Sequence, residues 1–194
     1  PDDRWKEPYM AAEELEKEQT HIFLGFLGPR AADQDYYPFK VLDALLSGMG
    51  GRLWDYLREK RGLGYAVDSW LDSGVDPGAF AVYIATSPDQ EEVAIEGILE
   101  ELRRLKEEGV TDQELAKGKS YLIGSHDIRL QRNSSQVSSY LESEIFGGLG
   151  YQAVDIFARE VEAVSKDDIV RVVGKYFDLE NYSLAVVRGK ATGQ

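Results

Sequence analysis

The chain has 194 residues, of which 43% are hydrophobic and 11% aromatic, which is enough for a buried core and excludes a disordered acidic tail. Its 22 basic and 35 acidic side chains give a formal net charge of −13, which argues against nucleic-acid or anionic-membrane partners because both need a basic face. The absence of cysteine excludes disulfides, a thiolate nucleophile and any Cys-ligated metal. No stretch approaches the ~20 apolar residues of a membrane span. Because the chain starts at Pro1 rather than Met, we expect a mature or excised fragment from which the compartment cannot be read.

The first half of the chain predicts a mixture of strands and helices. Residues 1–18 are charged, and we expect them to be peripheral. Apolar runs bounded by turn residues predict strands, and apolar residues at helical spacing predict helices. In chain order these elements are a strand over 19–27, helices over 33–46 and 52–60, and strands over 64–73 and 78–86. Gly62 stands where a left-handed cap would end the second helix.

Helices dominate the second half. Residues 87–90 have the pattern of a capping box with a proline at the first helical position, and predict a helix that ends at Gly109. A second capping box at 111–114 opens a long helix that we expect to run towards Phe146. The remaining elements are helices over 151–163 and 165–176 and a strand over 182–187. This order predicts an α+β single domain over 1–194, with a mostly antiparallel sheet of about four or more strands and helices packed on one face.

The sequence is poor in the residues on which most catalytic centres depend. Its only histidines, His21 and His126, lie 105 positions apart, and no HExxH or HxxEH pairing exists. We interpret both as structural and expect no metal site in this chain. The glycine-rich loop at 48–51 lacks the GK[ST] of a phosphate-binding loop, so a nucleotide site is not expected.

One segment, residues 50–67, stands out from this background. It reads GGRLWDYLREKRGLGYAV, and places Arg52, Arg58, Lys60 and Arg61 together in the more acidic half of the chain. Such a cationic patch can hold a developing negative charge or a carbonyl group. The alternative is a solvated helix face of mixed charge.

The same segment resembles the signature of the C-terminal, non-metal ("inactive") domain in the pitrilysin and mitochondrial processing peptidase family of zinc metallopeptidases, the inverted zincins. There a Gly/Ser loop precedes SRL, an amphipathic turn, REKRGLAYSV and a strand; here Gly51 replaces the Ser and Gly64 the Ala. The HIFLGFLGP strand, the helix opening at Asp33 and the turn at 109–115 also match the family's progression. The resemblance implies the LuxS/processing-peptidase-like metallohydrolase fold.

The resemblance also implies a division of labour. In this family a preceding domain of the same fold carries an inverted HxxEH motif with zinc and the general-base Glu, and the second domain supplies an Arg and a Tyr seven residues apart. Those positions fall on Arg58 and Tyr65, which would bind the substrate carbonyl and stabilise the oxyanion. Residues 48–51 stand where non-catalytic members carry a longer glycine-rich substrate loop. In the short version here Gly48, Gly50 and Gly51 could contact substrate, although the sequence favours a plain helix–helix turn. Zinc is therefore expected in a partner HxxEH domain or subunit and not here, with a peptide substrate and association as a homo- or heterodimer.

Other interpretations remain open. The chain could belong to a pseudo-peptidase that has lost hydrolysis and serves as a structural or peptide-binding subunit, which an intact Arg58/Tyr65 pair disfavours. It could be an unrelated α+β binding module with an accidental motif match. Arg58 could merely complement a helix C-terminus, and Tyr65 could be a core aromatic. On the main interpretation the chain is part of a zinc-dependent metalloendopeptidase, and alone neither binds catalytic zinc nor hydrolyses peptides.

Overall fold

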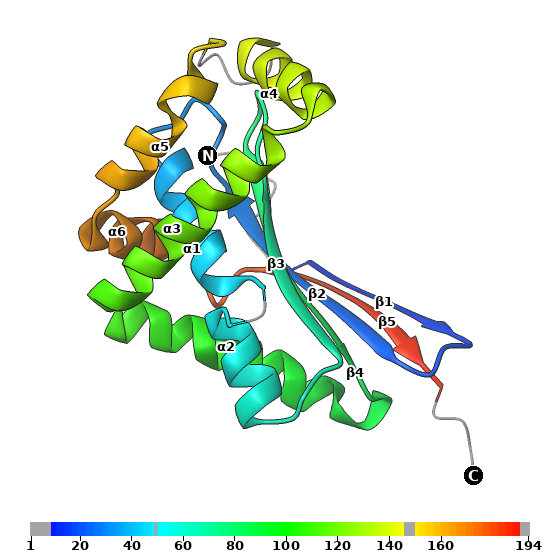
Figure 1. The fold of residues 1–194 in the computed structure, drawn as a ribbon. Coiled ribbons are helices and arrows are strands. Elements are labelled where there is room, and N and C mark those ends of the chain that lie inside the picture. The colour runs from blue at the N-terminus through cyan, green and yellow to red at the C-terminus, as the bar shows by residue number, and fades with distance from the viewer. Residues whose placement is uncertain (1–8, 49, 146–149, 191–194) are drawn as a thin grey trace.

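A computed structural model describes residues 9–48, 50–145 and 150–190 (Figure 1). The strands are β1 (Tyr9–Leu15), β2 (Thr20–Gly28), β3 (Ala66–Asp72), β4 (Gly78–Thr86) and β5 (Ser183–Gly189). The α-helices are α1 (Tyr36–Leu46), α2 (Glu91–Glu108), α3 (Asp112–Arg129), α4 (Asn133–Ile145), α5 (Ala153–Ala163) and α6 (Lys166–Tyr176). A π-helical segment, η2 (Trp54–Lys60), and a 3₁₀ turn, η3 (Pro88–Gln90), complete the elements. None of the helices in these three ranges is long and apolar enough to cross a membrane.

The five strands form one sheet in the order β1-β5-β2-β4-β3. The pairs β2–β4, β2–β5 and β3–β4 are antiparallel, and only β1–β5 is parallel. In β2, Ile22, Leu24 and Phe26 are buried, whereas Phe23 and Leu27 are exposed. This alternation is typical of a sheet with one covered face.

The helices supply that cover from one side, as Figure 1 shows. Helices α1, α2 and α6 contact the sheet, and their apolar side chains join those of the strands in one core. At its centre the rings of Phe39, Phe80 and Phe177 pack together, with centroids 5.2–5.9 Å apart. The predicted α+β fold, with a mostly antiparallel sheet and helices on one face, is therefore confirmed.

Strand β1 was not among the predicted elements and lies within the segment 1–18 that we expected to be peripheral. All seven of its residues are exposed, so its sequence shows no alternation of buried and exposed positions. Its partner is distant in the chain, since Tyr9 lies opposite Ser183. Pairing of this kind leaves no local signal. Residues 1–8 lie outside the described residues.

The prediction of one long helix after Thr111 was wrong. The chain turns at 130–132, where Gln131 N bonds to Ile128 O (3.2 Å) and Arg132 N to Arg129 O (3.4 Å) in place of helical i→i−4 bonds. This turn lets α4 pack on α5, with the Tyr140 hydroxyl 2.9 Å from the Asp155 carboxylate. The expected end at Phe146 lies outside the described residues.

One of the two predicted capping boxes forms and the other does not. Thr111 and Glu114 form theirs reciprocally: the Glu114 carboxylate accepts from Thr111 N (2.8 Å), and the Thr111 hydroxyl accepts from Glu114 N (3.2 Å). At residues 87–90 the box is absent, because the Ser87 hydroxyl bonds to the Gln90 side chain (3.1 Å) and a 3₁₀ turn precedes α2. Helix α2 ends at Gly109 as predicted, with φ +69°.

Candidate active-site segment

The glycine loop after α1 favours glycine at its three described glycine positions, at two by backbone conformation and at one by close packing. Gly48 and Gly50 have φ of +73° and +94°, in the left-handed region that favours glycine. A Cβ on Gly51 would lie 2.2 Å from the carbonyl oxygen of Ser47, so no larger residue fits this backbone. Lys117 of α3 donates a hydrogen bond to Gly50 O over 2.9 Å. The loop therefore has a structural role in joining α1 to η2.

The same three glycines line a cavity of about 420 Å³. Lys117 and Tyr121 of α3 also line it. The structure thus brings the three predicted substrate-contact glycines together at one hollow. Whether a substrate occupies it stays a prediction.

The short helix predicted over 52–60 is present and is wound as the π-helix η2. Leu53 and Leu57 are fully buried and anchor it to the core. The segment ends at Gly62, which has the left-handed φ (+65°) that the sequence predicts. Leu63 N then returns to Leu57 O over 2.8 Å, and this bond reverses the chain towards β3.

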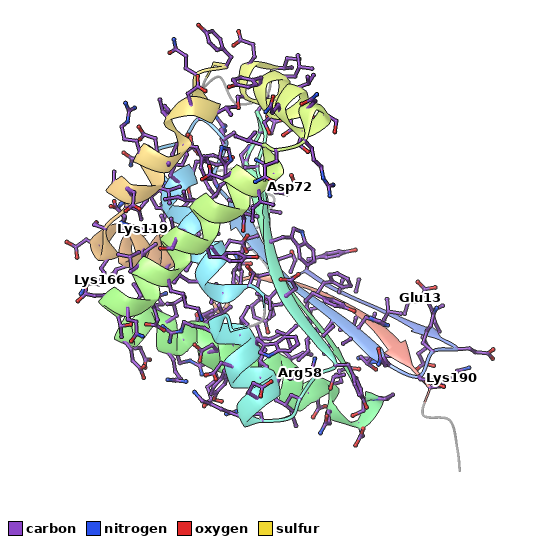
Figure 2. The ribbon with its side chains drawn as sticks, in the orientation of Figure 1. Glu13, Arg58, Asp72, Lys119, Lys166 and Lys190 are labelled. Carbon is purple, nitrogen blue, oxygen red and sulfur yellow. The ribbon has the colours of Figure 1, made fainter. Side chains whose placement is uncertain are left out.

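Arg58 and Tyr65, the two predicted catalytic residues, meet across this reversal. Arg58 Nη1 donates a hydrogen bond to the main-chain carbonyl of Tyr65 over 2.7 Å. Tyr65 N in turn donates to Ala85 O of β4 over 2.9 Å, which fixes the backbone of Tyr65 to the sheet. The Tyr65 side chain is 63% exposed, so it is not a core aromatic. Figure 2 shows Arg58 on η2, on the side nearer the strands.

Arg58 differs from the other cations of this patch in having no acidic partner among the described residues. Arg52 pairs with the buried Glu101 (2.7 Å), Lys60 with Asp55 (2.7 Å) and Arg61 with Glu100 (2.5 Å). No carboxylate within the described ranges lies within 4.0 Å of the Arg58 guanidinium. Only its Nη1 is engaged, by the Tyr65 carbonyl, which leaves its other N–H groups available to an incoming acceptor.

The face of the guanidinium has an aromatic neighbour that sequence reasoning missed. The central carbon of the Arg58 guanidinium lies 4.2 Å from the ring centroid of Trp54. Trp54 is half-buried: it packs against the hydrophobic core and also contacts the guanidinium. Its spacing of four residues from Arg58 was the available signal, because such pairs are neighbours on a helix.

The two histidines lie apart from this site. His21 on the uncovered face of the sheet bonds through Nδ1 to the Tyr83 hydroxyl (2.8 Å). His126 is buried and stacks on Phe157, with ring centroids 4.0 Å apart. Burial, together with the nearby Arg129, lowers the pKa of His126. Across the three described ranges, no cluster of three or more His, Asp or Glu side chains is placed to hold a metal ion.

Comparison with known sequences gives a family for this motif. Residues 3–122 match the family described as the peptidase M16 inactive domain. The chain is 32% identical over 173 residues to the uncharacterized zinc protease YmxG of Bacillus subtilis, which covers 89% of this chain and 42% of the relative. It is 33% identical over 171 residues to an uncharacterized zinc protease of Streptomyces coelicolor, which covers 88% of this chain and 37% of the relative. The chain thus spans less than half the length of these relatives.

Solved structures share the fold. The peptidase M16 inactive domain from Pseudomonas fluorescens superposes with a TM-score of 0.84 at 22% identity, covering 97% of this chain and 45% of that one. A chain of complex III2 from Candida albicans gives a TM-score of 0.83 at 13% identity, covering 93% of this chain and 46% of that one. The family indicated by the sequence motif is thereby confirmed: the chain belongs to the peptidase M16 inactive-domain family, the non-catalytic domain of M16 zinc proteases.

Proposed function

We propose that this chain is the non-metal half of a zinc metalloendopeptidase, in which Arg58 and Tyr65 bind the substrate carbonyl opposite a partner HxxEH domain or subunit. The observation that carries the proposal is the pairing of an un-neutralised guanidinium with the backbone of an exposed tyrosine. Zinc would be held by the partner and would supply the activation of a water molecule there. The residues described in this chain offer no set of ligands that fits the metal.

The contribution of this chain is electrostatic. When water attacks a peptide carbonyl, negative charge accumulates on the carbonyl oxygen. The N–H groups of Arg58 and the phenolic O–H of Tyr65 would donate hydrogen bonds to that oxygen. Such bonds strengthen as the charge develops, so they stabilise the transition state more than the bound substrate.

The glycine-lined cavity is a second place where this half could touch the peptide. Lys117, which donates to Gly50 O, and Asp55 of η2 also line it. Asp55 and Arg58 both belong to η2, so a peptide in this cavity would contact the same helix that carries the proposed oxyanion donor. We therefore assign Gly48, Gly50 and Gly51 to substrate contact through their main chain.

The test is steady-state hydrolysis by the complete protein, containing this chain and its HxxEH half, of an internally quenched peptide. Arg58→Ala is expected to lower kcat by about 10²–10³-fold, the usual cost of one oxyanion donor. Arg61→Ala is the matched control, because Arg61 is bound to Glu100 and the Tyr56 hydroxyl, and it should leave kcat within about twofold. Peptide binding without hydrolysis, or an unchanged kcat in Arg58→Ala, would instead indicate a structural or peptide-holding subunit.

A further inference from the structure

The Trp54 side chain restrains Arg58, although Trp54 has no part in the proposed chemistry. Trp54 presents its ring to the Arg58 guanidinium at 4.2 Å, a distance typical of a cation–π contact. The edge of the same indole is tethered, since Nε1 donates to the Glu59 carboxylate over 3.1 Å. One side chain therefore contacts two consecutive residues of the following turn.

The π-helical winding of η2 makes this double contact possible. In an α-helix the residue five positions on lies on a different face, so an indole in contact with Arg58 would not reach Glu59. A π-helix has a wider turn, closed by i→i+5 bonds. In η2 one full turn from Trp54 ends between Arg58 and Glu59, so both residues lie close to the indole. Single π turns are frequent at functional sites.

The second restraint on Arg58 comes from the sheet. Its Nη1 bonds to Tyr65 O, and Tyr65 N is bonded to Ala85 in β4. The guanidinium thus has the indole against its face and the carbonyl at one edge. A solvent-exposed arginine samples many rotamers, and ordering it in advance removes that cost from the reaction.

The indole also keeps the positive charge available. A carboxylate partner would neutralise Arg58, whereas an aromatic face restrains it without carrying a formal charge. Glu59, the adjacent carboxylate in the sequence, is engaged by the Trp54 N–H and makes no ion pair with Arg58. In a chain of net charge −13, this arrangement leaves one guanidinium un-neutralised next to an exposed tyrosine.

We propose that Trp54 is a positioning residue for peptide hydrolysis, which holds the Arg58 guanidinium in the orientation that meets the substrate carbonyl. The inference rests on the proposed function, because it concerns how Arg58 acts. Trp54 touches Arg58 and not the reacting atoms, so its removal should affect kcat through Arg58 alone. Contacts of the substrate with other residues should change little.

The experiment measures kcat and KM of the complete two-half protein with a quenched peptide. Trp54→Leu is expected to lower kcat about tenfold with KM within about twofold, because a displaced donor is a poorer oxyanion ligand. Trp54→Phe keeps an aromatic face and should retain kcat within about threefold of the original protein. Trp70→Leu is the matched control: Trp70 contacts Phe23, no cation of the described residues lies over its ring, and kcat should not change.

A double variant separates positioning from general destabilisation. In an Arg58→Ala background, Trp54→Leu should add less than about a twofold change in kcat, because the group that it positions is gone. Glu59→Ala frees the indole edge without altering the core, and its smaller loss of about threefold should vanish in the same background. If Trp54→Leu does not fold, Trp54→Phe and Glu59→Ala carry the test.

The outcomes distinguish the two proposals. An unchanged kcat in Arg58→Ala overturns the proposed function and this inference together. A large loss in Arg58→Ala with no loss in Trp54→Leu and Glu59→Ala leaves the proposed function standing and overturns the positioning role. If Trp54→Leu lowers kcat by the same factor in the original protein and in the Arg58→Ala background, the positioning role is also overturned, because Trp54 would then act independently of Arg58.

Discussion

The Arg58 guanidinium is bonded to the main-chain carbonyl of Tyr65, its partner seven positions along the chain, over 2.7 Å. The bond joins the side chain of one proposed catalytic residue to the backbone of the other. Because Tyr65 is also bonded to β4, the position of both residues is fixed by the sheet and not by the loop between them. Stability of the surrounding turns should therefore matter for the site as well as for the fold.

The loop before η2 gives a first prediction. Gly51→Ala should lower the free energy of unfolding by at least about 2 kcal/mol, because the new Cβ would lie 2.2 Å from the Ser47 carbonyl. Gly124→Ala in α3 is the control: nothing lies within 4 Å of its Cβ, so the better helix propensity of alanine should stabilise by about 0.5–1 kcal/mol. Urea denaturation measures both. Equal stability of Gly51→Ala and the original chain would show that the backbone here adapts.

A second prediction concerns Asp35, which joins α1 to α6. Its carboxylate is fully buried and accepts hydrogen bonds from Arg171, Lys175 (2.5 Å) and Tyr176 (3.0 Å). Burial raises the pKa of Asp35, but these bonds outweigh it and hold the pKa below the usual value.

Asp35→Asn should therefore cost about 2–4 kcal/mol in unfolding free energy, because charge-assisted bonds to a buried acceptor are lost. The control Asp127→Asn changes an exposed carboxylate on α3 and should stay within about 0.5 kcal/mol. Chemical denaturation at neutral pH compares the two. A cost for Asp35→Asn as small as that of the control would mean that α1 and α6 are held by apolar packing alone.

A third prediction is a pH dependence at the start of α6. The hydroxyl and backbone N–H of Ser165, followed by Arg171, lower the pKa of Asp168 to about 2. A carboxylate with a depressed folded-state pKa adds stability above its unfolded pKa of about 4, and this stability is lost as the pH falls to about 2. The difference in unfolding free energy between the original chain and Asp168→Asn should be constant above about pH 5 and shrink between pH 4 and 2. A difference that stays constant down to pH 2 would refute the low pKa.

A fourth prediction concerns metal. Elemental analysis of this chain alone should find zinc far below one equivalent, because its described residues form no ligand cluster. In the complete protein, a chelator should abolish turnover and added zinc should restore it. Stoichiometric zinc in the isolated chain would contradict the assignment of the metal to the partner half.

The elements that the sequence predicts well are those with local signals. The capping box at Thr111 and the left-handed Gly62 both appear as expected, because each depends on residues within one turn. The short helix carrying Arg58 was also predicted, and its contact with Tyr65 follows from the reversal at Gly62.

The features that escaped prediction are set by distant or subtle contacts. Strand β1 forms through pairing with β5 at the other end of the chain, and no alternation marks it. The π-helical winding of η2 has no established sequence signature, and without it the double contact of Trp54 cannot be inferred. The break between α3 and α4 lets α4 pack on α5, a tertiary contact that the sequence of the turn does not reveal.

Tyr65→Phe in the complete two-half protein is the most direct test, because it removes one hydroxyl from a largely exposed side chain. The melting temperature should not change, whereas kcat at saturating peptide should fall by about 10²–10³-fold. A kcat equal to that of the original protein would contradict a role for Tyr65 in stabilising the oxyanion.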